Sequence, residues 1–277
     1  MIVNLDGAFV ALEQACLPVG DGALLFGDSL FETLKAYGRK ICFIEEHLDR
    51  LTLSARLLDF PANRARLHQA LLETAERLPW PVSRLRLTLT RGEMAGFEPC
   101  SETGRFVITA VPYREPGAAE RQTGAACLWA PNQRVNPLSH LPQMKRGNYA
   151  DCLYAAQFAR RHGAREALFR TPAGEVLEGA TSNLFIVRDG RLLTPPAGDL
   201  VLAGILRRQT LQAAAELGLP TLEAAITETD LLTADEACLS NALIDLLPVA
   251  AVAGQALRRG PWAERLLRHI RQNAKAP

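Results

Sequence analysis

The alternation of hydrophobic and polar positions predicts short strands and amphipathic helices mixed along the whole chain. The clearest strand is "SRLRLTLTRG", in which apolar and polar residues alternate strictly. The clearest helix begins at Glu45, in "EEHLDRLTLSARLLDF", where two glutamates in the first turn suit the helix dipole. Its expected apolar face consists of four leucines: Leu48, Leu51, Leu57 and Leu58.

The same strand alternation and helical spacing of apolar residues predict the other elements. Strands are expected in 1–10 around an Asp6-Gly7 turn, in 30–44 around Tyr37-Gly38, in 104–113, in 125–130, three times within 166–196, and twice within 236–252. Further helices are expected over about 63–78, after Pro142, over 203–218 ending at Gly218, and over 260–274 with Pro261 near the first turn. Helices and strands mix without regular alternation, so we expect an α+β fold.

The stretch "REPGAAERQTG", residues 114–124, is rich in Pro, Gly and charge and has no periodicity. It is the best candidate for an interdomain linker. We therefore expect a smaller N-terminal α+β domain over 1–113 and a larger C-terminal domain over 125–277.

The helix expected after Pro142 has an unusual beginning. Its apolar stripe is expected to comprise Tyr149, Leu153, Ala156 and Phe158. Lys145 and Arg146 stand where this helix would start, and cations there oppose the helix dipole at a cost of roughly 0.3–1 kcal/mol each. The lysine therefore calls for another explanation.

Charge and cysteine usage narrow the function classes. With 31 basic and 30 acidic residues the net charge is +1, and no Lys/Arg-dense block is present, which argues against a nucleic-acid or anionic-membrane surface. The six cysteines form no C-x-x-C pair and the five histidines are isolated, so neither a disulfide framework nor a metal site is expected. No secretory signal or membrane span is visible, and we expect a cytoplasmic protein.

Four positions together suggest chemistry. Lys145 offers an amine, Glu178 lies at the end of a predicted strand, Arg50 lies within a helix, and Gly204 stands at a helix start, where backbone N–H groups can hold a phosphate. Taken singly, each is more often a surface residue or an ordinary helix start. A lysine nucleophile, an acid, an arginine and a helix N-terminus are, however, the set that pyridoxal phosphate requires.

Several motifs in chain order carry a resemblance to a known family: "FGDSLFET", "EEHLDRL", "KRGNY", "EGATSNLF", "LAGILR" and "NALIDLLPV". The chain thereby resembles, over nearly its whole length, the two-domain fold type IV (class IV) pyridoxal-phosphate enzymes, which include aminotransferases and aminodeoxychorismate lyases. The resemblance implies that Lys145, in the C-terminal domain, is the Schiff-base lysine and that Glu178 pairs with the pyridine nitrogen. It also implies that Arg50 and the backbone at Gly204 hold the phosphate and that Leu202 packs on the ring.

The implied cofactor-binding set is Arg50, Lys145, Tyr149, Glu178, Ser182, Asn183, Leu202, Gly204, Ile205, Leu206, Asn241 and Ala242. The candidate substrate-binding set is Phe31, Arg91, Arg134 and Asn241, the two arginines being candidates because an anionic substrate needs cations. On this resemblance the imine would bury Lys145 and lower its pKa, which explains a lysine at this position. The family also implies a homodimer.

The residues that separate the subgroups favour the lyase. Branched-chain aminotransferases usually have one more residue between the lysine and Asn-Tyr, and threonines where this chain has Leu206 and Ala242. D-amino-acid aminotransferases usually have a tyrosine at Phe31 and an Arg-x-His pair after "TRG". "SNALIDLLPV" resembles many aminodeoxychorismate lyases, so we expect a lyase that releases pyruvate and 4-aminobenzoate. A transaminase of D-amino or branched-chain amino acids is the alternative, and an inactive binding protein of the same shape is the non-enzyme alternative.

Overall fold

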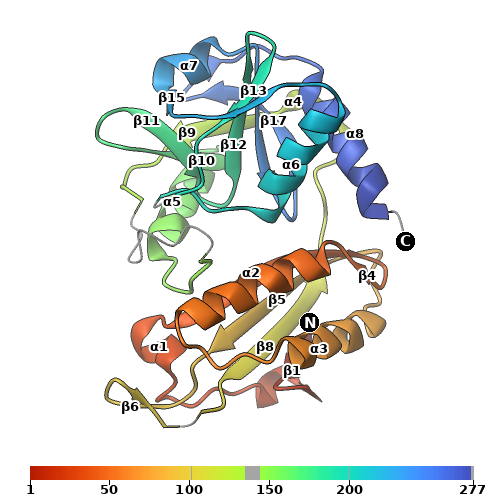
Figure 1. Cartoon of the computed structure of the whole chain (residues 1–277), viewed down its shortest axis with the longest axis vertical. Helices are drawn as coiled ribbons and strands as arrows, with labels where there is room; N and C mark the ends of the chain where they lie inside the picture. The colour runs from red at the N-terminus through yellow and green to blue at the C-terminus, as the bar shows by residue number, and fades with distance from the viewer. Residues whose placement is uncertain (101, 135–143, 199, 276–277) are drawn as a thin grey trace. The chain divides into compact units, whose positions relative to one another are not determined.

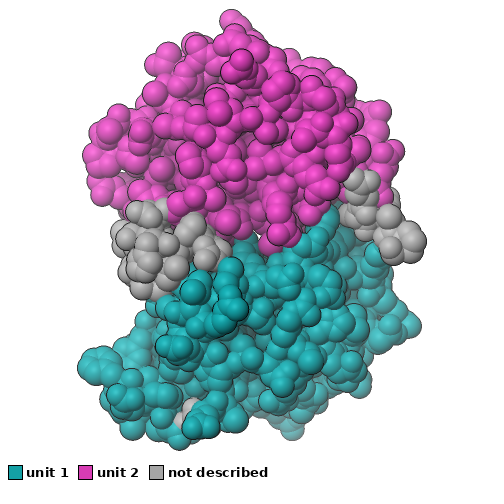
Figure 2. All heavy atoms as spheres, in the orientation of Figure 1, with its two compact units in different colours: residues 1–115, 143–148 teal, residues 116–142, 149–277 magenta. Residues whose placement is uncertain are grey.

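The computed structural model describes residues 1–100, 102–134, 144–198 and 200–275. The chain divides into two compact units, drawn in different colours in Figure 2. Unit 1 comprises Met1–Glu115 with Gln143–Asn148, and unit 2 comprises Pro116–Pro142 with Tyr149–Pro277. Lys145 thus clusters with unit 1, whereas the sequence analysis placed it in the second domain. No helix in the described ranges is long and apolar enough to cross a membrane.

Unit 1 is an antiparallel six-stranded sheet in the order β2-β1-β8-β5-β3-β4, with two helices packed on it (Figure 1). Its strands are β1 (Ile2–Leu5), β2 (Ala8–Val10), β3 (Ser29–Tyr37), β4 (Lys40–Ile41), β5 (Val82–Thr90) and β8 (Arg105–Pro112). Its helices are α1 (Gly22–Phe26), α2 (Ile44–Leu57) and α3 (Arg64–Glu76), beside a 3-10 turn at Leu12–Gln14 and a hairpin of β6 (Met94–Ala95) and β7 (Glu98–Pro99).

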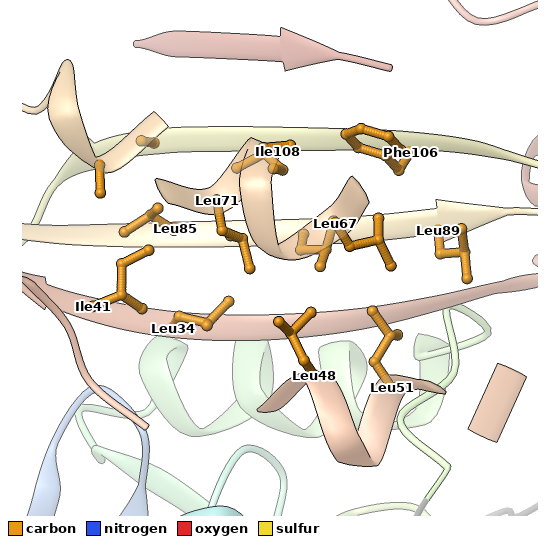
Figure 3. Close-up of a cluster of buried hydrophobic side chains, with 14 of the residues drawn as sticks. Leu34, Ile41, Leu48, Leu51, Leu67, Leu71, Leu85, Leu89, Phe106 and Ile108 are labelled. Carbon is orange, nitrogen blue, oxygen red and sulfur yellow. The ribbon is translucent and has the colours of Figure 1, made fainter. Parts of the chain in front are cut away.

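The core of unit 1 follows from strand alternation. Figure 3 shows inward-facing residues of β3, β5 and β8 meeting α2 and α3, among them Leu34, Leu85, Ile108, Leu48 and Leu71. The expected four-leucine face of α2 is wrong at Leu57, which is 43% exposed. Nine residues at about 100° each place Leu57 on the opposite side of the helix from Leu48. The buried face therefore ends before the last turn.

Unit 2 contains a mixed sheet in the order β14-β13-β12-β16-β17-β9-β10-β11-β15, with β18 beside β17. Its strands are β9 (Ala125–Trp129), β10 (Glu166–Arg170), β11 (Glu175–Gly179), β12 (Asn183–Arg188), β13 (Arg191–Thr194), β14 (Thr221–Glu223), β15 (Ile226–Thr227), β16 (Glu236–Asn241), β17 (Asp245–Val252) and β18 (Gln255–Ala256). Its helices are α4 (Ala118–Thr123), α5 (Ala150–Arg161), α6 (Ile205–Glu216), α7 (Glu228–Thr233) and α8 (Trp262–Lys275). Residues 166–196 thus hold four strands rather than the three expected.

The stretch 114–124 contains a helix that periodicity does not reveal. Helix α4 has no buried residue, so it carries no apolar stripe. Its order comes from other contacts: Glu120 accepts a hydrogen bond from the Gly117 amide at 3.1 Å, and Arg121 donates to backbone carbonyls of Ile244 and Leu246. The contacts of Arg121 join residues more than a hundred positions apart, and a local pattern does not show them.

The helix expected at Lys145 begins later. Helix α5 starts at Ala150, so Lys145 and Arg146 precede it and do not oppose its dipole. The expected stripe is also wrong at Leu153, which is 56% exposed. The buried face consists of small residues: Cys152, Ala155 and Ala159. Small residues give little hydrophobic signal, and for this reason the stripe was misplaced.

Candidate active site

In unit 1, the segment that carries Lys145 runs beside the start of β3. The Phe31 amide donates to the Lys145 carbonyl at 2.9 Å, and the Gly147 amide donates to the Ser29 carbonyl at 2.7 Å. A Cβ added at Gly147 would lie 1.8 Å from the Ser29 hydroxyl, so the close approach requires glycine there. The backbone on either side of Lys145 is therefore fixed against β3.

Two cations share the ring of Phe31, which is buried on β3. The Lys145 Nζ atom lies 4.6 Å from the ring centroid, and the Arg86 guanidinium carbon lies 3.8 Å from it. Cation–π attraction helps to hold both. Lys145 is partly buried in this structure. Arg86 was missed in the sequence analysis, although strict alternation in β5 already places it opposite the core-facing Leu85 and Leu87.

Two arginines, Arg91 and Arg146, lie against the carboxylate of Asp28. Arg91 donates to the Asp28 carboxylate at 2.8 Å, and Arg146 lies 3.8 Å from its other oxygen. Arg91 also donates to the carbonyls of Leu58 and Asp59, at 3.0 and 2.9 Å. Arg91 was expected to bind a substrate anion, but these contacts give it a structural role after α2. Arg146, which had no assigned role, has an acidic neighbour.

Arg50 lies in a buried charged cluster on α2 and β3. It donates from Nε and Nη2 to the two oxygens of Glu32, at 2.7 and 2.5 Å, and His47 Nδ1 lies 2.7 Å from the same carboxylate. Burial alone would raise the pKa of Glu32. The charges and hydrogen bonds of Arg50 and His47 outweigh this effect and lower the pKa to about 2. The sequence signal for Glu32 was a charged residue at a core-facing strand position, between Leu30 and Leu34.

In unit 2, Glu178 is buried and held by three donors. The side chain of Asn183 donates to it at 3.0 Å, and the Leu202 amide donates to the same oxygen at 3.1 Å. The Arg134 guanidinium lies 3.3 Å from the other oxygen. Burial lowers the pKa of Arg134, but the charges of Glu178 and of neighbouring groups, among them Asp151, together raise it above its ordinary value. Arg134, expected at the substrate, here pairs with the candidate catalytic acid.

Two hydroxyls of the expected cofactor-binding set bond within the protein. Ser182 donates to buried Glu166 at 2.9 Å, and Tyr149 donates to the Ala180 carbonyl at 3.1 Å. Burial raises the pKa of Glu166, while hydrogen bonds from Thr181 and Ser182 oppose this rise. These contacts fix the turn between β11 and β12.

The N-terminus of α6 is built for an anion. Gly204 is its N-cap residue and provides no side-chain cap, so the first amides, beginning with Ile205 and Leu206, have no side-chain cap to accept their hydrogen bonds. A Cβ on Gly204 would lie 2.0 Å from the side-chain oxygen of Asn183, so this position requires glycine. Leu202, two residues earlier, is half-buried beside Glu178.

Asn241 is the last residue of β16, and Ala242 follows it in the turn to β17. The Asn241 side chain accepts hydrogen bonds from the amides of Leu243 and Ile244, both at 2.9 Å, and donates to the Thr181 carbonyl at 3.1 Å. Its amide group therefore shapes the turn. Ala242 supplies no side-chain donor.

The donor set fits pyridoxal phosphate. The cofactor needs an amine, an acid for its ring nitrogen and an anion site for its phosphate, and the chain offers Lys145, Glu178 and the uncapped α6. The chain has only four lysines: Lys35, Lys40, Lys145 and Lys275. Lys35 forms an ion pair with Glu115, with 2.8 Å between Nζ and the carboxylate oxygen, and Lys40 is exposed. No metal-binding group of three or more His, Cys, Asp or Glu occurs among the residues that the structure describes.

Comparison with known proteins identifies the family. The family model described as "Amino-transferase class IV" matches residues 29–252. A putative branched-chain-amino-acid aminotransferase of Methanocaldococcus jannaschii is 33% identical, covering 93% of this chain and 90% of its own. A bifunctional aminodeoxychorismate lyase / D-amino acid transaminase of Mycobacterium tuberculosis is 30% identical, with 95% of each chain covered. The crystal structure of a branched-chain aminotransferase from Thermoproteus uzoniensis with norvaline superposes with a TM-score of 0.89 at 29% identity, covering 99% of this chain and 94% of that one.

Proposed function

The chain belongs to the class IV aminotransferases, which are pyridoxal-phosphate enzymes, and on that premise we propose that it transfers the amino group of branched-chain amino acids. This choice departs from the lyase expected from the sequence. It is supported by the relatives, among which branched-chain aminotransferases recur.

The observation that carries the proposal is the arrangement around Phe31. Its apolar ring lies beside the amine of Lys145 and the guanidinium of Arg86, at 4.6 and 3.8 Å from the centroid. An amino acid with an apolar side chain presents a carboxylate for a guanidinium and a hydrocarbon group for an aromatic ring. The aromatic ring of Phe31 and the guanidinium of Arg86, which would complement these two groups, lie together in unit 1.

We propose a separate role for each of the candidate residues. The bound cofactor supplies the aldehyde that takes up the substrate amine and a ring that accepts electrons. Lys145 would hold the cofactor through its side-chain amine, and the same amine would move the proton at the substrate α-carbon. Glu178 would keep the ring nitrogen protonated, and the α6 amides and Arg50 would bind the phosphate. Leu202 would contact the ring.

The lyase remains a second candidate because of one stretch, "SNALIDLLPV". There the Asn241 amide shapes the β16–β17 turn, and neither Leu206 nor Ala242 has the hydroxyl expected of a branched-chain enzyme. Lyase and transaminase share the removal of the α-proton by Lys145. They differ in what leaves afterwards, so the substrate decides between them.

A substrate comparison tests the proposal. The cofactor-loaded protein is offered leucine with 2-oxoglutarate, D-alanine with 2-oxoglutarate, and aminodeoxychorismate alone. We expect glutamate to form fastest with leucine. Pyruvate released from aminodeoxychorismate without an amino acceptor would support the lyase instead, and preference for D-alanine would support the D-amino-acid alternative.

We also propose that the protein acts as a cytoplasmic homodimer. Around α1, unit 1 exposes apolar side chains that a second copy could cover: Val19 (79% exposed), Leu24 (66%), Leu25 (50%), Phe26 (49%) and Phe97 (88%). Burying a patch of this kind favours association. Sedimentation should report twice the mass of one chain, whereas a single-chain mass at micromolar concentration contradicts the dimer.

A further inference from the structure

Asn183 contacts both Glu178 and the start of α6. Its side-chain Nδ2 donates to the Glu178 carboxylate at 3.0 Å and to the Leu202 carbonyl at 2.9 Å. The amide of Leu202 donates to the same Glu178 oxygen at 3.1 Å. Glu178, Asn183 and Leu202 thus form a closed ring of hydrogen bonds, in which Asn183 is only 5% exposed.

The other end of the same amide faces Gly204. The side-chain oxygen of Asn183 would lie 2.0 Å from a Cβ at that position, so the two residues are in close contact. Gly204 is the N-cap of α6. One side chain therefore touches the candidate acid and the first residue of the candidate phosphate site.

The backbone of Asn183 is fixed on both sides. Asn183 pairs with Ser240 in the β12–β16 ladder, and the residues that follow it in β12 are buried. The two preceding residues, Thr181 and Ser182, donate their hydroxyls to Glu166 at 2.7 and 2.9 Å. A side chain on so constrained a backbone can hold a partner in one orientation.

We propose that Asn183 is a positioning residue that orients Glu178 toward the cofactor's ring nitrogen. The inference rests on the proposed role of Glu178 and goes beyond it, since Asn183 was expected to bind the cofactor itself. Glu178 has three rotatable side-chain torsions, and without the Asn183 donor its Oε2 atom loses a hydrogen bond that it shares with the Leu202 amide. A charge-assisted hydrogen bond to the ring nitrogen depends on that orientation.

A pair of cofactors measures this contact directly. Pyridoxal phosphate and its 1-deaza analogue, in which a CH group replaces the ring nitrogen, share the aldehyde and the phosphate. The ratio of their dissociation constants, measured on the full chain freed of cofactor, isolates the contact between Glu178 and the ring nitrogen. We expect the unmodified chain to bind the natural cofactor roughly tenfold to a hundredfold more tightly.

The variants are Asn183→Ala and, should that chain fold poorly, Asn183→Ser, whose side chain is too short to replace the amide. Either should lower the ratio about tenfold by weakening the natural cofactor more than the analogue. The matched control is Thr194→Val, which removes a buried hydroxyl that donates to the Leu184 carbonyl at 2.7 Å, next to Asn183 in sequence. This control should leave the ratio unchanged.

The outcomes separate the two proposals. If Asn183→Ala weakens both cofactors equally and keeps the ratio of the unmodified chain, Asn183 has only a structural role and this inference is overturned while the role of Glu178 stands. If the unmodified chain itself binds the two cofactors equally, the role of Glu178 is wrong and this inference is overturned with it. A selective fall of the ratio supports both.

Discussion

At the scale of single residues, the candidate site depends on buried charged groups that are paired. Glu32 is 1% exposed and lies against both Arg50 and His47. Burying a charge is costly unless a partner compensates it. Removing one partner leaves the other charge buried and unpaired, with the full desolvation cost. Arg50, proposed to bind the phosphate, is therefore held in place by the buried carboxylate of Glu32.

This pairing predicts a pH dependence of stability. The folded-state pKa of Glu32 is about 2, below its ordinary 4.5, so its carboxylate stabilises the fold above that ordinary value and loses this contribution as the pH falls toward 2. Between about pH 6 and about pH 3, the free energy of unfolding should fall by about 2 kcal/mol more in the unmodified chain than in Glu32→Gln. Denaturant titrations across this range measure the difference.

The control is Glu76→Gln, which removes an exposed carboxylate paired with Arg39 at 2.9 Å. Exposed pairs contribute little, so its pH dependence should follow that of the unmodified chain. Parallel curves for Glu32→Gln and the unmodified chain would show that the buried pair does not stabilise the charged form.

At the scale of elements, helix ends are satisfied by distant side chains. The buried carboxylate of Glu236, at the start of β16, accepts hydrogen bonds from the amides of Trp262 and Ala263, at 2.8 and 2.7 Å. These are the first amides of α8, which have no partner within the helix. A sequence search for a capping residue next to α8 does not find this one, because it lies 26 residues earlier.

Removing this cap should destabilise the fold. Glu236→Ala leaves two buried amides without acceptors, and we expect a loss of about 1–3 kcal/mol in the free energy of unfolding. Glu264→Ala is the matched control in the same first turn, because its carboxylate is exposed and pairs with exposed Arg268. Equal unfolding midpoints for the two variants would contradict the capping role.

The elements that the sequence predicted well are those with a strong local signal. The hairpin at Asp6-Gly7, the strand Val82–Thr90 and the helix ending before Gly218 are confirmed, because turn residues and strict periods specify them. Helix α4 was not predicted, and the buried face of α5 was predicted at the wrong residues. Neither helix presents a stripe of large apolar residues. Local pattern carries no information where small or exposed residues form the element.

At the scale of the whole molecule, family motifs predicted the fold class and the cofactor, which the comparisons confirm. The partners of the candidate residues could not be predicted from the sequence. Arg91 and Arg134 were candidates for binding a substrate anion; in the structure Arg91 donates to Asp28, 63 residues away, and Arg134 pairs with Glu178. Partners so distant in sequence become visible only when the chain is folded.

The central claim is that Lys145 holds the cofactor. The chain has four lysines, so borohydride reduction of the pyridoxal-phosphate-loaded protein followed by peptide mass spectrometry gives an unambiguous answer. We expect the reduced cofactor on Lys145, a protein that is yellow before reduction, and no label in Lys145→Ala, while Lys40→Ala is labelled normally. Label on Lys35, Lys40 or Lys275 instead, or a chain that stays colourless with the cofactor, would contradict the account.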